Sequence, residues 1–233
     1  MKPASQNTIA QNIQSVRDQI YALEEKYGRP LGSVQLLAVS KTRPIEDINE
    51  AFSANQSYFG ENYLQEALSK IEAATETSIE WHFIGPTQSN KTRQIAENFQ
   101  WVHTIDRLKI AQRLSEQRSP ELPPLNVCIQ VNVSGEDSKS GVAPEETLSL
   151  AKQISELPNI KLRGLMAIPA SSSDFEQQRK PFKLLRELKD EVQSQGIELD
   201  TLSMGMSNDM EAAIAEGSTI VRIGTAIFGA RNV

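Results

Sequence analysis

The chain is poor in cysteine and histidine and has no long apolar run. Its 233 residues include one cysteine, Cys128, and two histidines, His82 and His103. A single cysteine excludes an intramolecular disulfide and any zinc site built from several cysteines. No stretch approaches the roughly 18 uninterrupted apolar residues of a membrane span, and the first residues lack the apolar core of a signal peptide. These absences predict a cytoplasmic protein that does not bind a membrane.

The chain also has fewer basic than acidic residues. Lysine and arginine total 24 against 30 aspartate and glutamate residues, so the formal net charge is −6. A chain this acidic is a poor match for the phosphate backbone of a nucleic acid. The carboxylates show no metal-ligand spacing, so we expect no metal site. A composition with 39% hydrophobic and 23% charged residues is typical of a globular protein.

Eight short β-rich runs alternate with amphipathic segments. The β-rich runs cover residues 35–40, 57–60, 79–84, 101–105, 125–133, 161–168, 199–204 and 219–223. The amphipathic segments cover residues 45–54, 64–74, 91–98, 107–117, 144–157, 175–195 and 208–216, and a further helix over 8–27 precedes the first strand. Such alternation favours parallel βαβ units.

Eight parallel strands are enough to close a TIM-type (β/α)8 barrel. An open doubly wound sheet has the same alternation of elements. However, the first strand ends in Val39-Ser40-Lys41-Thr42 and not in a glycine-rich dinucleotide loop. We therefore predict an α/β fold in which residues 1–233 form one barrel domain with an extra N-terminal helix.

Lys41 is the strongest candidate for a reactive group. It follows an apolar strand and precedes a helix start. Desolvation beside such a core disfavours the ammonium form, and a neutral amine can form a Schiff base with an aldehyde or ketone. The alternative is a lysine that extends to solvent at a strand end. Lys91 and Lys139 lack a comparable apolar wall.

The ends of the seventh and eighth strands have features of a phosphate site. Gly205 and Ser207 lead directly into a helix, and Gly224 and Thr225 close the last strand. In barrels these two loops often bind phosphate through backbone N–H groups. Each glycine alone could instead mark a tight turn. Together with Lys41, the loops suggest an aldehyde that carries a phosphate, which fits pyridoxal 5′-phosphate or a phosphosugar.

Arg222 lies two residues before Gly224, so regular alternation points both to the same side of the strand. A guanidinium facing a pyridine nitrogen would donate to it and keep it unprotonated, which weakens the ring as an electron sink. The alternative is an ordinary salt bridge at the barrel end. For His82 and His103 a satisfied position in the core is favoured over a ligand role, and Cys128 is expected to be inert core.

Eight short motifs along residues 36–229 occur in a specific order and spacing. They are AVSK at 38–41, FGENY at 59–63, WHFIG at 81–85, QSNK at 88–91, VNVSGE at 131–136, GLMAI at 164–168, SMGMS at 203–207 and VRIGT at 221–225. In this combination the chain closely resembles the pyridoxal phosphate homeostasis protein family. That family is similar to the N-terminal barrel of alanine racemase and to the fold-type III pyridoxal phosphate enzymes.

The resemblance implies a specific cofactor site. Pyridoxal 5′-phosphate would be held as a covalent aldimine on Lys41, with Arg222 at the pyridine nitrogen. Ser207, Gly224 and Thr225 would bind the phosphate. The side chains lining the cofactor would be Asn62, His82, Met166 and Ser203.

The resemblance also implies a role in intracellular vitamin B6 homeostasis and in amino-acid and keto-acid balance, without established catalytic turnover. Alanine racemase has a second, β-rich domain with a catalytic tyrosine, which we expect this chain to lack. Of its four tyrosines, only Tyr63 falls near the expected active face. We expect a monomeric carrier whose partners are the cofactor and, potentially, apo-enzymes that use it. The alternatives are a racemase-like enzyme and, without this cofactor, a phosphosugar isomerase or Schiff-base aldolase.

Overall fold

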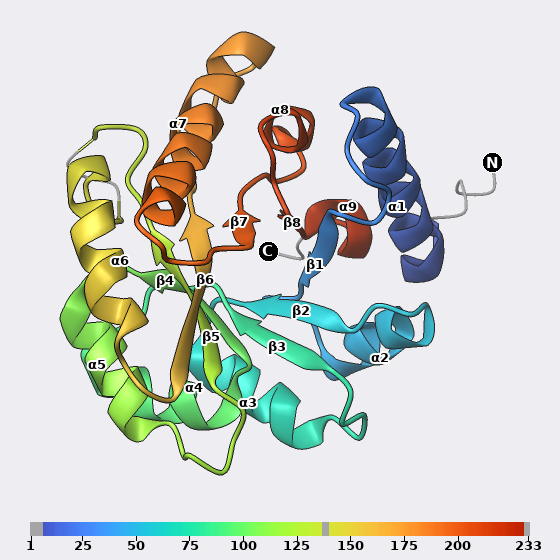
Figure 1. The fold of residues 1–233 in the computed structure, drawn as a ribbon. Coiled ribbons are helices and arrows are strands. Elements are labelled where there is room, and N and C mark those ends of the chain that lie inside the picture. The colour runs from blue at the N-terminus through green and yellow to red at the C-terminus, as the bar shows by residue number, and fades with distance from the viewer. Residues whose placement is uncertain (1–6, 137–139, 231–233) are drawn as a thin grey trace, which may run out of the picture.

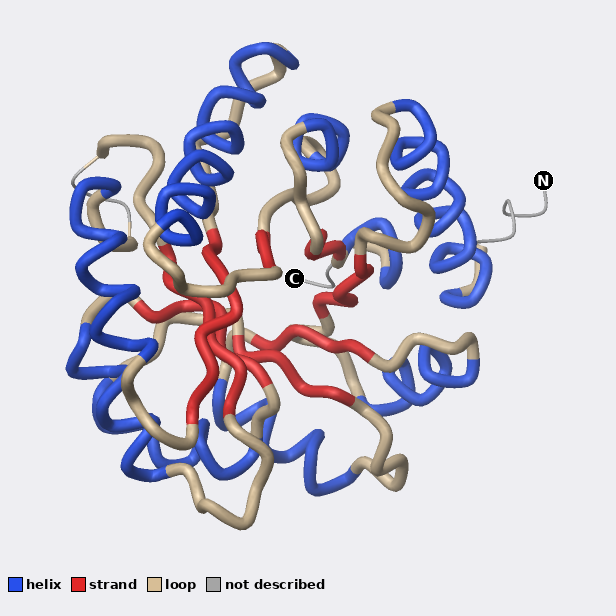
Figure 2. Tube along the Cα trace, viewed as in Figure 1, coloured by secondary structure: helices blue, strands red, loops and turns tan. Residues whose placement is uncertain are grey.

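Eight parallel strands close into a barrel in the computed structural model, which describes residues 7–136 and 140–230 (Figures 1 and 2). The strands follow one another in chain order, and β1 pairs with β8 to close the sheet. Their bounds are β1 Gln35–Val39, β2 Tyr58–Glu61, β3 Glu80–Phe83, β4 Trp101–Ile105, β5 Leu125–Gln130, β6 Ile160–Met166, β7 Thr201–Ser203 and β8 Ile220–Ile223. The closed barrel confirms the predicted (β/α)8 fold over the open sheet.

Helices surround the barrel, as Figure 2 shows. In the described ranges they are α1 Ile9–Lys26, α2 Ile45–Ser53, α3 Leu64–Ala73, α4 Thr92–Asn98, α5 Leu108–Gln117, α6 Thr147–Ser155, α7 Phe175–Ser194, α8 Met210–Ala215 and α9 Thr225–Phe228, with 3-10 turns η1 Ser89–Lys91 and η2 Pro144–Glu146. The first of these is the predicted N-terminal helix, and a capping box between Thr8 and Gln11 starts it. It packs against α9, so the first and last helices lie side by side (Figure 1).

Two apolar clusters hold the barrel together. The inner cluster fills the barrel and consists of Leu37, Ile84, Trp101, Cys128, Met166 and Ile220. The larger outer cluster packs the strands against the helices. On β1, Leu37 belongs to the inner cluster while Leu36 and Ala38 belong to the outer one, as the alternation of a strand requires. Burial on both faces explains why the strands are continuously apolar in the sequence.

The described part of the chain contains no helix with both the length and the apolar character needed to cross a membrane. It also contains no group of three or more His, Cys, Asp or Glu side chains that could hold a metal ion. Cys128 is fully buried, and burial raises the pKa of its thiol to about 12. This thiol is therefore inert core, as expected. Lys139 lies outside the described residues.

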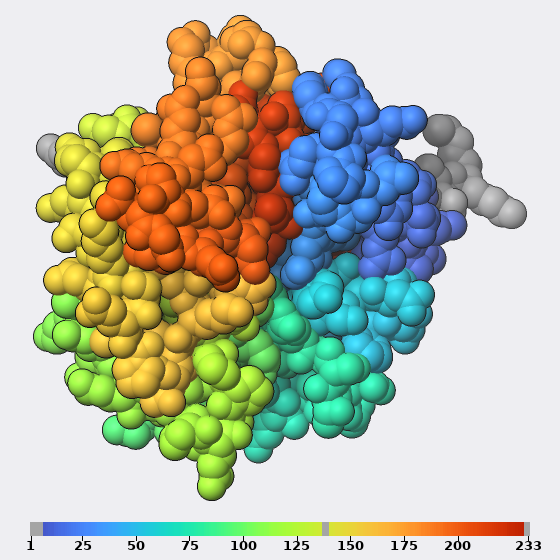
Figure 3. All heavy atoms as spheres, viewed as in Figure 1, coloured from blue at the N-terminus to red at the C-terminus, as the bar shows by residue number. Residues whose placement is uncertain are grey.

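The carboxyl ends of parallel strands meet at one end of a barrel, where loops assemble a site. Here the chain leaving β8 continues into α9 beside the turn after β1. In the space-filling view, the last elements (red) lie between the N-terminal residues (blue) and α7 (orange) (Figure 3). The barrel therefore brings both ends of the described chain to the same site.

Substitution of Gly164 tests the tightness of the barrel. A β-carbon on Gly164 would lie 1.7 Å from the carbonyl oxygen of Thr201 on β7. We expect Gly164→Ala to lower the free energy of unfolding by at least about 1–3 kcal/mol, because β6 and β7 must separate to admit the methyl group. The exposed control Lys161→Ala on the same strand should stay within about 0.5 kcal/mol in urea unfolding. Equal stability of the two variants would contradict this packing.

Candidate functional site

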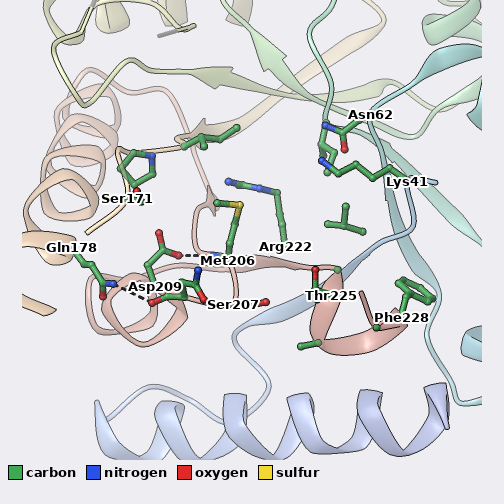
Figure 4. Close-up of a pocket in the computed structure, with 18 of the residues that line it drawn as sticks. Lys41, Asn62, Ser171, Gln178, Met206, Ser207, Asp209, Arg222, Thr225 and Phe228 are labelled. Carbon is green, nitrogen blue, oxygen red and sulfur yellow. Dashed lines mark hydrogen bonds between the residues drawn. The ribbon is translucent and has the colours of Figure 1, made fainter. Parts of the chain in front are cut away.

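A cavity of about 650 Å³ opens at the carboxyl ends of the strands, a size typical of small-molecule sites. Segments at the ends of β1, β2, β3, β6, β7 and β8 line it. In the close-up, Lys41 and Asn62 lie together on one wall, Gln178 and Asp209 lie on the opposite side, and Arg222 stands between them (Figure 4). The cavity therefore has polar side chains on two facing walls and a cation between them.

The structure brings most of the predicted site residues together in this cavity. Its lining includes Lys41, Asn62, Ser207, Arg222, Gly224 and Thr225. The remaining predicted residues are fully buried and are not among its lining residues; they are His82, Met166 and Ser203. Met166 belongs to the inner cluster, and Ser203 accepts a hydrogen bond from Arg222. These three residues form a layer behind the cavity wall.

Lys41 lies in a tight turn that follows β1. The Ser40 N–H donates to the Gly60 carbonyl at 3.0 Å, and the Arg43 N–H donates back to the Ser40 carbonyl at 3.1 Å. Thr42 has φ = 64°, in the left-handed region, which costs a β-branched residue roughly 1–2 kcal/mol. Its N–H donates to Glu66 Oε1 at 2.6 Å. Contacts on both sides of Lys41 therefore hold a strained turn in place.

A buried lysine supports this turn from below. Lys70 Nζ donates to the Ser40 carbonyl at 2.8 Å and to Glu61 Oε1 at 2.8 Å, and it also pairs with Glu66. Ser40 Oγ donates to the same Glu61 oxygen at 2.6 Å. Burial raises the pKa of Glu61, and the charge of Lys70 only partly offsets that rise. The cluster thus joins β1, β2 and α3 beneath the turn that carries Lys41.

Arg222 forms the charged floor of the cavity. Its side chain is buried, and it donates from Nη1 to Ser203 Oγ at 2.7 Å and from Nη2 to the Ala167 carbonyl at 3.0 Å. Burial lowers the pKa of this guanidinium to about 10, while the charge of Asp209 acts in the opposite direction. Arg222 therefore stays positively charged at neutral pH, with further N–H groups for a ligand in the cavity.

The loops after β7 and β8 shape the end of the cavity that suits an anion. Gly205 has φ = 105°, and a β-carbon there would lie 2.7 Å from Ala213 Cβ, so only glycine fits without movement of α8. At the next loop, α9 begins at Thr225, and the first N–H groups of a helix have no partner within it. With the hydroxyl groups of Ser207 and Thr225, these N–H groups can bind a phosphate.

Asp209 and Gln178 hold the loop after β7 in position. Asp209 Oδ1 accepts from the Met206 N–H at 2.7 Å. Gln178 on α7 donates to the carbonyls of Ser172 at 2.7 Å and Asn208 at 3.1 Å. Burial raises the pKa of Asp209, and its bond from Met206 opposes that rise. The loop is therefore braced from α7 and from within.

Asn62 carries an unsatisfied polar atom at the cavity. Its Oδ1 is buried and has no hydrogen-bond partner within the described residues, although the side chain lines the cavity next to Lys41 (Figure 4). A buried acceptor without a partner costs about 1–3 kcal/mol. A ligand with a donor at this position would remove that cost, so Asn62 is suited to a polar small molecule.

Sequence reasoning missed the supporting residues Glu61, Lys70 and Asp209. A signal for Lys70 does exist, because it falls in the buried stripe of α3 together with Leu64 and Ala67. A lysine in such a stripe needs a buried anion. Its partners could not be named from the sequence, since Glu61 comes from another element.

The sequence is similar to known proteins along nearly its whole length. The family model described as the alanine racemase N-terminal domain matches residues 9–232. A protein of Vibrio alginolyticus named pyridoxal phosphate homeostasis protein is 60% identical over 230 residues, covering 97% of this chain and 99% of its own length. A protein of the same name from Escherichia coli K12 is 55% identical over 234 residues, covering 97% and 98%.

Solved structures show the same fold. PipY of Synechococcus elongatus, determined with pyridoxal phosphate bound, has a TM-score of 0.83 and 37% identity, covering 95% of this chain and 100% of that chain. Alanine racemase of Corynebacterium glutamicum has a TM-score of 0.70 at 19% identity, covering 96% of this chain and 60% of that chain. The second likeness is one of fold alone.

Lys70→Met tests the buried cluster. The substitution leaves the Glu61 carboxylate buried without its cation, so we expect the free energy of unfolding at about pH 7.5 to fall by about 3–5 kcal/mol. The exposed control Lys183→Met, which loses only a surface pair with Glu187, should stay within about 1 kcal/mol.

The loss of unfolding free energy in Lys70→Met should also depend on pH, in a direction that the pKa of Glu61 determines. The folded-state pKa of Glu61 is raised, so the folded state takes up a proton at a higher pH than the unfolded state does. The destabilisation by Lys70→Met is therefore largest above the folded pKa and shrinks as the pH falls through it. Denaturant unfolding at about pH 5.5 should show a smaller loss than at about pH 7.5; an equal or larger loss would contradict the assignment to Glu61.

Proposed function

The chain belongs to the pyridoxal phosphate homeostasis protein family, and on that premise we propose that it binds pyridoxal 5′-phosphate in the cavity at the end of the barrel. Its role is the intracellular balance of this cofactor and of amino and keto acids. The observation that carries the proposal is one cavity lined by Lys41, by the buried cation Arg222 and by the loops of Ser207 and Thr225. In pyridoxal phosphate, Lys41 would match the aldehyde, Arg222 the ring nitrogen, and the two loops the phosphate.

Each end of the ligand has a matching group. Lys41 Nζ would bond to the aldehyde carbon as a Schiff base, with loss of water. Arg222 would donate to the ring nitrogen, which then needs no proton of its own. Ser207, Gly224 and Thr225 would hold the phosphate through hydroxyl and backbone N–H groups. Asn62 would accept a hydrogen bond beside Lys41.

The three predicted residues outside the cavity lining are assigned a supporting role. Ser203 contacts Arg222 directly, Met166 fills the barrel below it, and His82 lies deeper still. When bound, pyridoxal phosphate supplies an aldehyde and an electron-accepting ring. An arginine at the ring nitrogen limits the second of these, because it does not protonate the ring.

We propose that the protein holds and hands over the cofactor and has no catalytic residue. A racemase of the two-base type needs a second proton carrier opposite the lysine. Tyr63 is half exposed and is not among the residues that line the cavity. Asp209 lines it, but its carboxylate accepts the Met206 N–H. This arrangement favours a carrier over the racemase-like alternative.

Residues 1–233 would act as one domain and as a monomer in the cytoplasm, with cofactor-dependent apo-enzymes as recipients. A phosphosugar isomerase or aldolase would use the same lysine and loops. The relative solved with pyridoxal phosphate bound supports the cofactor over a sugar.

Lys41→Ala tests the covalent attachment. We expect the wild-type protein mixed with pyridoxal phosphate to develop a visible absorption band, which borohydride abolishes while adding mass at Lys41. Lys41→Ala should lack the reducible band because Lys41 is the only lysine among the described residues that line the cavity, whereas the control Lys91→Ala should keep it. Mass added at a different lysine, or a wild-type protein that takes up no cofactor, would overturn the proposal.

Thr225→Ala tests the phosphate end. We expect this variant to bind pyridoxal phosphate about tenfold more weakly, since a hydrogen bond to a charged group contributes about 1.5–3 kcal/mol. Its affinity for pyridoxal, which has no phosphate, should not change. Thr225→Ser keeps the hydroxyl and should bind like the wild type. Equilibrium dialysis with both ligands measures the difference, and an equal loss for both ligands would count against a phosphate contact.

A further inference from the structure

A continuous line of polar contacts runs through the inside of the barrel, from Arg222 to the opposite end. Arg222 Nη1 lies 2.7 Å from Ser203 Oγ, which lies 2.8 Å from His103 Nδ1. His103 Nε2 lies 2.9 Å from His82 Nδ1, and His82 Nε2 lies 3.1 Å from Glu80 Oε1. Strands β8, β7, β4 and β3 therefore each contribute to one chain of hydrogen bonds.

The middle of this chain is sealed from solvent and held rigidly. His82, His103 and Ser203 are all fully buried. His82 stacks on Trp101 with ring centroids 5.2 Å apart and planes 6° apart, and the Tyr58 ring meets it edge-on. Glu80 is different, because 36% of its side chain is exposed. The line of hydrogen bonds thus begins at Arg222 on the cavity floor and ends at the Glu80 carboxylate, which is in contact with water.

Chemistry allows one direction of donation along this line. Arginine only donates, so Ser203 Oγ accepts from Arg222, and its own hydroxyl proton is then directed to His103 Nδ1. His103 must carry its proton on Nε2 and donate to His82 Nδ1. His82 in turn carries its proton on Nε2 and donates to Glu80. Every contact is then a hydrogen bond with both imidazoles neutral.

The opposite direction fails at Glu80. It would need a protonated Glu80, but 36% of this side chain is exposed to water. Burial acts to raise the pKa of the Glu80 carboxyl, yet the hydrogen bond from Trp101 and the charge of Arg163 act in the opposite direction, and the pKa is lowered overall. The other alternative is a doubly protonated His82. Burial lowers the pKa of His82, and burial reinforced by the charge of Arg222 lowers that of His103 well below its ordinary value.

We propose that Ser203, His103, His82 and Glu80 are positioning residues that act through one another to fix Arg222 as a charged donor aimed at the ring nitrogen of the bound cofactor. This inference rests on the proposed function. The one-way chain presents a permanent acceptor to Nη1, and the Ala167 carbonyl presents another to Nη2. Two arms of the guanidinium are thereby anchored, so its remaining N–H groups face the cavity without having to reorient.

The direction of donation along this line of hydrogen bonds can be measured before any ligand is added. The protein has two histidines, so a long-range proton–nitrogen NMR spectrum of the ¹⁵N-labelled apo protein contains two imidazoles. At neutral pH we expect both to be neutral, with Nε2 protonated and Nδ1 bare. A proton on His103 Nδ1, or a doubly protonated ring, would overturn the proposed chain.

Glu80→Gln tests whether the chain acts as a unit. Its amide can donate as well as accept, so the opposite direction becomes available to both histidines. We expect His103, two contacts away, to show a mixture of tautomers. The control Glu97→Gln removes an exposed carboxylate on α4 and should leave the spectrum unchanged. An unchanged His103 in Glu80→Gln would show that the contacts do not act as a chain.

Ser203→Ala tests the aim of Arg222. We expect it to bind pyridoxal phosphate roughly three- to tenfold more weakly, the effect of one lost hydrogen bond. Its affinity for the 1-deaza analogue, which carries C–H in place of the ring nitrogen, should match that of the wild type. No loss, or an equal loss for both ligands, would overturn the role given to the chain. If the wild type binds neither ligand, the proposed function fails as well, whereas the NMR result on the apo protein stands by itself.

Discussion

The pairing of β1 with β8 is the constraint on which the cavity depends. It places Leu37 opposite Arg222 and Ala38 opposite Ile223, so that the turn carrying Lys41 meets the loop carrying Gly224 and Thr225. Side chains near the start of the chain reinforce the closure. Asn12 donates to the Ile227 carbonyl at 2.8 Å, and Arg43 donates to the Gly229 carbonyl at 2.6 Å. Closing such a long loop costs entropy, which these bonds and the shared core offset.

Two of the buried cations, Lys70 and Arg222, lie near the cavity, and the barrel stabilises them in different ways. Lys70 is surrounded by carboxylates and a carbonyl, so its charge is compensated within the wall. Arg222 has neutral acceptors, Ser203 and Ala167. A buried cation that is not hydrogen-bonded to a carboxylate attracts any acceptor that enters the cavity. Of these two buried cations, Arg222 is therefore the one whose charge is available to a ligand, while the charge of Lys70 serves the structure.

The contacts that stabilise Arg222 explain the roles of His82 and Ser203. Both belong to motifs that resemble a cofactor-binding family, yet both lie behind the wall of the cavity. Their contacts lead to Arg222, so they can influence a ligand that they do not touch. In the proposed site, an arginine anchored in this way would donate to the ring nitrogen without protonating it. It would thereby limit the chemistry of the cofactor, as the proposed carrier role requires.

Much of the fold and part of the site could be read from the sequence alone. The alternation of apolar runs and amphipathic segments predicted the closed barrel, because strands and helices bury their faces with different periods. The glycines and hydroxyl residues after two strands, and the lysine after another, predicted a cavity at one end because the carboxyl ends of parallel strands meet there. These are local patterns combined with a general rule of topology.

Tertiary structure alone decided which side chains share a wall and which lie behind it. The contact of Ser203 with Arg222, the pairing of Lys70 with Glu61 and the hydrogen-bond chain from Arg222 to Glu80 each join different strands or helices. Such contacts depend on strand register, and a shift of one residue turns a side chain to the other face. Register across a barrel is set by packing of the whole core, so no local pattern in the sequence contains it.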